Sequence, residues 1–160
     1  RGPMLMGALQ QMLTQVQWGA LDVLLVDLPP GTGDVQMTLA QKAHVDGAVI
    51  VSTPQDVALL DARKGIDMFR QLDVPILGMV ENMSTHVCSK CGHEEHVFGH
   101  GGVAAEAAKL GVPLLAEIPL DLQIRLASDG GAPVVVSAPD SAQARAFAAV
   151  AEALVAQGVA

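Results

Sequence analysis

The strongest constraint on the fold of this chain is the alternation of short, continuously apolar runs with longer segments of helical periodicity. Three of these runs, residues 21–27, 48–53 and 76–81, have the composition of buried strands. None of them alternates apolar and polar residues, as a half-exposed antiparallel strand would. Buried strands that alternate with helices favour an α/β fold with a doubly wound, mostly parallel sheet.

Helical periodicity fills most of the chain between and after these strands. It predicts a helix that starts after Pro3 and helices over residues 56–72, 103–110 and 141–157. Residues 114–118 and 134–136 are shorter strand candidates. No repeat or linker divides the sequence, so we expect one domain over residues 1–160.

Composition limits the class of protein. The chain has 160 residues, of which 51% are hydrophobic and 16% are charged, which suits a globular domain with a substantial core. Its net charge of -8 and lack of a basic cluster argue against nucleic acid as a partner. The apolar runs are too short to span a bilayer and no secretory leader opens the chain, so we expect a cytoplasmic protein without a membrane partner.

Cys88 and Cys91 form a C-x-x-C pair followed by Gly92. Two thiolates at this spacing can hold one metal centre from a tight turn, but zinc or an iron-sulfur cluster normally requires four ligands. Because the pair is a poor structural staple in a reducing compartment, metal or redox chemistry is the better interpretation. We therefore expect a metal-binding loop at residues 84–100 that ligands from elsewhere complete.

A second candidate site follows the first expected strand. Asp27 ends that strand, and the sequence continues as Leu-Pro-Pro-Gly-Thr-Gly-Asp. P-loop nucleotidases place an acidic residue at such a strand tip to hold magnesium through its water shell, with a glycine beyond it near the terminal phosphate. A Pro-Gly turn with a capping aspartate explains the bare pattern equally well.

The phosphate-binding loop G-x-x-x-x-G-K-[ST] occurs nowhere in the 160 residues. The glycine-dense loop at residues 98–102 precedes an expected helix but lacks the lysine. Its amides could meet an anion, although a plain loop before a helix is the better explanation.

Several long motifs occur in one order along nearly the whole chain, and together they resemble the Mrp/ApbC group of iron-sulfur carrier ATPases, relatives of the septum-site and plasmid-partition ATPases. The motifs cover residues 1–4, 24–38, 54–58, 78–84, 88–92, 98–102 and 117–121. The resemblance implies a P-loop NTPase-like fold. It is far more specific than a lone C-x-x-C.

For the phosphate side of a nucleotide site, the resemblance implies that Asp27 orders magnesium. It also implies that Gly31, Thr32 and Gly33 form the loop that responds to the γ-phosphate of ATP.

For the base, the resemblance implies that Asn82 contacts the adenine edge and that Pro119, Leu120 and Asp121 form the opposite wall. A carboxamide both donates and accepts hydrogen bonds, which suits a purine edge. A turn role for Asn82 is equally consistent with its position.

For the cysteines, the resemblance implies a homodimer in which Cys88 and Cys91 of two subunits hold one shared [4Fe-4S] cluster. Such a protein would receive the cluster from a donor and transfer it to apo iron-sulfur proteins, using ATP and magnesium. Members of the group carry a glycine-rich phosphate loop near their start, so we expect this chain to be the C-terminal part of a longer ATPase and inactive in hydrolysis alone.

Two alternatives stay open. Cys88, Cys91, His93 and His96 could chelate one zinc ion as a structural knuckle, although histidines in a polar loop are usually solvent-exposed. The chain could instead be a partition-type regulatory ATPase without cluster transfer. Its membrane-bound form is disfavoured, because the last expected helix has Arg145 as its only basic residue.

Overall fold

The computed structural model describes residues 2–29 and 31–159, so Arg1, Pro30 and Ala160 lie outside the described residues. The helices are α1 (Gly2–Gln15), α2 (Asp34–Lys42), α3 (Asp56–Gln71), α4 (Gly102–Leu110), α5 (Leu122–Asp129), α6 (Val134–Ser137) and α7 (Ala142–Ala156). The strands are β1 (Ala48–Ser52), β2 (Ile76–Asn82), β3 (His86–Val87), β4 (Glu94–Glu95) and β5 (Leu114–Ile118).

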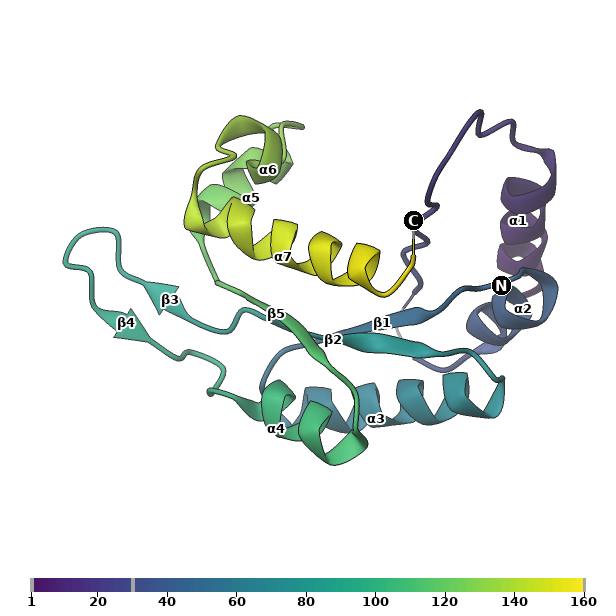
Figure 1. Ribbon diagram of the computed structural model, residues 1–160, viewed down its shortest axis with the longest axis horizontal. Coiled ribbons are helices and arrows are strands. Elements are labelled where there is room, and N and C mark those ends of the chain that lie inside the picture. Colours follow the sequence, from purple (N-terminus) through teal and green to yellow (C-terminus); the bar gives the residue numbers. More distant parts are fainter. Residues whose placement is uncertain (1, 30, 160) are drawn as a thin grey trace.

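The main sheet is parallel, with the strand order β1-β2-β5. Helices α3 and α4 cover one face of it and α7 covers the other (Figure 1). A sheet with both faces covered explains why its strands lack a polar face, and β2 is largely buried from end to end. The prediction of an α/β fold with a parallel sheet between helices is confirmed.

The core is thicker on the side of α3 and α4. An apolar stripe of α3 packs against β1, and the buried cluster on this side is Ala48, Ile50, Leu59, Ala62, Ile66, Phe69, Val74, Met79, Val103 and Ala107. On the α7 side the buried cluster is smaller and consists of Val80, Leu115 and Ile118, with partly buried residues of α7 packed on them. Fewer side chains therefore fill the space between the sheet and α7.

The strand predicted over residues 21–27 is wrong. This segment is irregular, and Leu25 is 81% exposed. A strand needs a neighbour for its backbone hydrogen bonds. Within the described ranges β1 pairs with β2 alone, and 21–27 pairs with no strand. Asp27 consequently does not end a strand, and its side chain lies in an exposed part of the chain.

The short strand predicted at residues 134–136 is also wrong, because these valines begin α6. Pro133 sits directly before that helix, where a proline's fixed φ and missing N–H favour a helix start. Sequence patterns missed α2, α5 and the small antiparallel hairpin β3–β4. Among the described residues, no helix has both the length and the apolar character that crossing a membrane requires.

Candidate functional site

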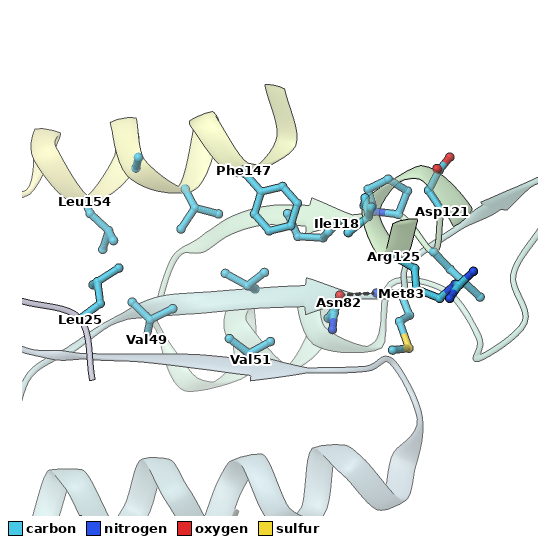
Figure 2. Close-up of a pocket in the computed structure, with 16 residues that line it drawn as sticks. Leu25, Val49, Val51, Asn82, Met83, Ile118, Asp121, Arg125, Phe147 and Leu154 are labelled. Atoms are coloured by element: carbon cyan, nitrogen blue, oxygen red, sulfur yellow. Dashed lines mark hydrogen bonds between the residues drawn. The ribbon is translucent and has the colours of Figure 1, made fainter. Parts of the chain in front are cut away.

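A pocket of about 590 Å³ lies between the sheet and α7 and extends over the carboxyl ends of the strands (Figure 2). Its volume lies within the range of small-molecule sites. The walls are mainly apolar, and the polar side chains at its edge belong to Asn82, Asp121 and Arg125. The other lining residues are Leu25, Val49, Val51, Val80, Met83, Ile118, Pro119, Leu120, Ile124, Phe147, Val150, Ala151 and Leu154.

The structure thus brings together the four residues predicted for the base site. Asn82 is the last residue of β2, and Pro119, Leu120 and Asp121 directly follow β5. The two strands are parallel neighbours, with Asn82 opposite Ile118 in the register. Residues that follow adjacent parallel strands meet at the same sheet edge, which is where such folds bind ligands.

Asn82 also shapes the chain that leaves β2. Its Oδ1 accepts a hydrogen bond of 3.0 Å from the backbone N–H of Met83, as Figure 2 shows. Met83 has a φ of 57°, a left-handed conformation that is uncommon for a residue with a side chain. Asn82 therefore both forms the turn and lines the pocket, and its carboxamide nitrogen is the group directed away from the turn.

Asp121 uses both carboxylate oxygens within the protein. One accepts from the backbone N–H of Gln123 at 2.6 Å and caps α5, and the other accepts from Gln143 Nε2 on α7 at 2.7 Å. These bonds connect the pocket wall to two helices. In the pocket, Asp121 therefore serves mainly to hold the wall in place.

The residues predicted for the phosphate side lie elsewhere. Neither Asp27 nor the loop containing Gly31, Thr32 and Gly33 lines the pocket. The loop is held from inside by Gln36, which is only 3% exposed. Its Oε1 accepts from the N–H of Gly33 at 3.1 Å, and its Nε2 donates to the carbonyl of Gly31 at 2.8 Å and to that of Pro29. Sequence analysis missed Gln36, although glutamine three residues into a helix is a known capping signal.

The cysteines lie at the tip of the hairpin β3–β4, which projects from the rest of the fold (Figure 1). The backbone N–H of Cys88 donates to the carbonyl of His93 at 2.9 Å, and the N–H of Gly92 donates to the carbonyl of Cys88 at 2.8 Å. Gly92 has a φ of 71°, which favours glycine at this point of the turn. Both thiols are free, with Cys88 partly buried and Cys91 exposed.

The turn favours the ionised form of one thiol. The backbone N–H groups of Lys90 and Cys91 lower the pKa of Cys88 from its ordinary value, and the thiol of Cys91 and the charge of His86 add to the effect. A thiolate is the form that binds metals. The hairpin tip therefore favours the metal-binding form of Cys88 more than an isolated thiol would.

The described histidines and cysteines of this loop do not come together as one metal site. His96 lies at the root of the hairpin, where Nδ1 is 3.2 Å from the carbonyl oxygen of Ser84 and its ring stacks on His100 with centroids 4.3 Å apart. Over residues 2–29 and 31–159, no group of three or more His, Cys, Asp or Glu side chains is placed to share a metal ion. The geometry thus gives no support to the zinc alternative.

Glu81 is a further residue that sequence analysis did not single out. It is fully buried, and its Oε2 accepts from the N–H of Val103 at 3.0 Å and its Oε1 from the N–H of Gly101 at 3.4 Å. The carboxylate therefore occupies the amino end of α4. The glycine-dense loop at 98–102 meets an anion supplied by the protein itself, which agrees with a structural role for that loop.

The parallel sheet, the helices on both faces and the pocket at the strand ends define a P-loop NTPase-like α/β domain. Two solved structures support this class. A nucleotide-binding protein from Archaeoglobus fulgidus in complex with ADP has a TM-score of 0.73 and is 40% identical, with 86% of this chain and 56% of that chain covered. The cell division ATPase MinD of Pyrococcus furiosus has a TM-score of 0.69 and is 25% identical, with 98% and 59% covered.

The family model described as ParA, NUBPL iron-transfer P-loop NTPase, matches residues 1–155, so the chain belongs to this family. The iron-sulfur cluster carrier protein of Pseudomonas fragi is 57% identical over 141 residues, which cover 88% of this chain and 49% of that protein. The iron-sulfur cluster transfer protein NUBPL of Mus musculus is 52% identical over 155 residues, which cover 97% and 49%. The chain thus spans about half the length of these relatives, and the resemblance to the Mrp/ApbC carriers is confirmed.

Proposed function

We propose that this chain is the cluster-holding and base-binding part of an iron-sulfur cluster carrier. The observation that supports this most strongly is the pair of free thiols on a projecting hairpin, with the thiolate of Cys88 favoured by its turn. Since no third ligand stands ready within the described part of the chain, the site needs partners from outside. An exposed thiolate pair suits a cluster that must be exchanged rather than kept.

The cargo in this proposal is a [4Fe-4S] cluster held by Cys88 and Cys91 of two copies of the chain in a homodimer. Two sulfurs from each copy supply the four thiolates that the cluster requires. The dimer would accept the cluster from a donor and pass it to apo iron-sulfur proteins. The proposed setting is the cytoplasm, without nucleic acid or a membrane as partner.

The pocket is proposed to bind the adenine of ATP. Asn82 offers its carboxamide N–H donors at one edge, and Pro119, Leu120 and Asp121 form the other wall. The apolar faces of Val49 and Phe147 suit the flat surface of a base. The volume and donor set thus fit the nucleoside part of the ligand.

Asp27 is proposed to order magnesium, with Gly31, Thr32 and Gly33 near the γ-phosphate. In the structure these residues lie outside the pocket, and the sequence has no lysine-bearing phosphate loop. We therefore assign these 160 residues, one partial P-loop NTPase-like domain, no hydrolysis of their own. Catalysis would need the glycine-rich loop that activates the phosphates in such enzymes.

Anaerobic reconstitution tests the proposal. The chain is incubated with ferrous iron and sulfide, and iron, labile sulfide, visible absorbance and molecular mass are measured. We expect about two iron atoms per chain in a dimer, because four are shared by two copies. The variants Cys88→Ser and Cys91→Ser should each lose the absorbance while keeping the wild-type circular dichroism.

The matched control is Ser89→Ala, which changes an exposed residue between the cysteines and leaves both thiols in place. One zinc per monomer without iron would instead favour the knuckle. Stoichiometric iron in the double cysteine variant, or a colourless wild-type monomer, would contradict cluster carriage.

A further inference from the structure

One residue of the pocket wall, Leu120, is also part of the hairpin root. The backbone N–H of Leu120 donates to the carbonyl of Thr85 at 2.8 Å, and the carbonyl of Leu120 is 3.0 Å from Nδ1 of His86. Just before these residues in the chain, the N–H and the hydroxyl of Ser84 both donate to the carbonyl of Ile118, at 3.0 and 3.2 Å. The wall after β5 and the start of the hairpin are therefore bonded as one unit.

The hydrogen bond to Leu120 fixes the state of the His86 ring. A carbonyl oxygen can only accept, so Nδ1 must carry the hydrogen and donate it. His86 belongs to β3, two residues before Cys88. Its side chain is thus the connection from the pocket wall that lies closest in sequence to the thiols.

The two ends of the hairpin are held differently. At the far end, the amides of Gly101 and Val103 are bound by the buried carboxylate of Glu81, which does not line the pocket. At the near end, the chain turns at Met83, whose left-handed conformation is held by the Asn82 side chain in the pocket. A ligand that contacts Asn82 and Leu120 therefore acts directly on the near end, which His96 joins to the other arm through a 3.2 Å contact with the carbonyl of Ser84.

We infer that His86 is a positioning residue that links the contents of the pocket to the orientation of the Cys88–Cys91 turn. An adenine nucleoside in the pocket moves the Leu120 peptide, and His86 transmits that movement to β3. By thermodynamic reciprocity, occupation of the thiols changes nucleoside affinity by the same factor. This inference rests on the proposed base site and cluster site, and it adds the connection between them.

The test uses the 160-residue chain, with adenosine as the probe. Alkylation rates of Cys88 and Cys91 by iodoacetamide are measured by mass spectrometry, with and without saturating adenosine. Adenosine should change the Cys88 rate by about fivefold, at the low end of allosteric coupling factors. In His86→Leu, which lacks a donor to Leu120, the Cys88 rates with and without adenosine should become equal.

Rescue separates positioning from a general structural effect. In His86→Asn the side-chain amide can place a donor near the original Nδ1, so the adenosine response should return. His44→Leu is the matched control, since His44 is exposed and lies outside the hairpin. Amide NMR spectra check that each variant keeps the wild-type fold and that adenosine shifts the signals of the pocket.

The outcomes are distinguishable. If adenosine shifts no pocket signal, the base site fails and the inference fails with it. If adenosine binds but the wild-type alkylation rates do not respond, or His86→Leu responds like wild type, the inference alone is overturned. Iron uptake by the same samples reports on cluster carriage independently of both results.

Discussion

The buried carboxylate of Glu81 leads to the sharpest stability prediction. It accepts one hydrogen bond of ordinary length from Val103 and a longer one from Gly101, and it is fully removed from solvent. Hydrogen bonds to charged groups contribute about 1.5–3 kcal/mol each. An anion at a helix amino end adds up to about 2 kcal/mol in partly buried sites.

Glu81→Gln keeps one acceptor oxygen and replaces the other by an NH₂ group that faces a backbone N–H. It loses the weaker bond, about 1.5 kcal/mol, and part of the charge interaction with α4. The free energy of unfolding should therefore fall by about 2 kcal/mol. Glu81→Ala loses both bonds and should cost about 4 kcal/mol, a large part of the roughly 5–15 kcal/mol of a typical domain.

Urea unfolding followed by circular dichroism measures the effect. With a slope of about 2 kcal/mol per molar urea, Glu81→Gln should lower the midpoint by about 1 M. The matched control is Glu117→Gln, because Glu117 lies opposite Glu81 in the register of β5 but is exposed. That variant should change stability by less than about 0.5 kcal/mol. Equal midpoints for the two glutamine variants would refute the capping argument.

Three other substitutions test separate contacts. Cys91→Ala removes a thiol that helps to lower the pKa of Cys88, so alkylation of Cys88 should reach half its maximal rate at a higher pH than in wild type. Arg63 lowers the pKa of the buried Glu106 below its ordinary value of 4.5 through a bidentate hydrogen bond, so the pair stabilises the fold above that pH and loses its effect as the pH falls through the lowered value. Arg63→Met should therefore destabilise the protein at neutral pH and reduce the loss of stability on acidification. Urea unfolding at neutral and at acidic pH measures both effects. Ser141→Ala removes the side-chain cap of α7 and should cost about 1 kcal/mol in the same assay.

The placement of Asn82 beside residues 119–121 is predictable because it depends on topology alone. Once the strands that end at Asn82 and Ile118 are known to be parallel neighbours, the residues that follow them must share one edge. The stripe of α3 was predictable for a similar reason. Its apolar side chains recur with the helical period, and Leu59, Ile66 and Phe69 of that stripe are buried.

The contacts of Gln36, Glu81 and His86 could not be predicted in this way. Each joins a side chain to backbone groups of a loop whose path no periodicity determines. In the sequence, Glu81 is a polar residue near a strand end and suggests exposure. Only the position of α4 over β2 shows that two backbone N–H groups donate to its oxygens. These hydrogen bonds offset the cost of burying the carboxylate.

The segment at 21–27 shows the opposite failure, in which a strong local signal lacks its tertiary partner. Its valines and leucines favour a strand, but the preference reflects packing and pairing on a sheet rather than the backbone alone. In the described residues the outer edge of β1 is unpaired, and Val51 on that edge is 60% exposed. Leu25 shares the pocket with Val49 of β1 without a ladder between the two segments (Figure 2). Composition alone therefore marks this segment as a strand, while the backbone hydrogen bonds that would make it one require a neighbour.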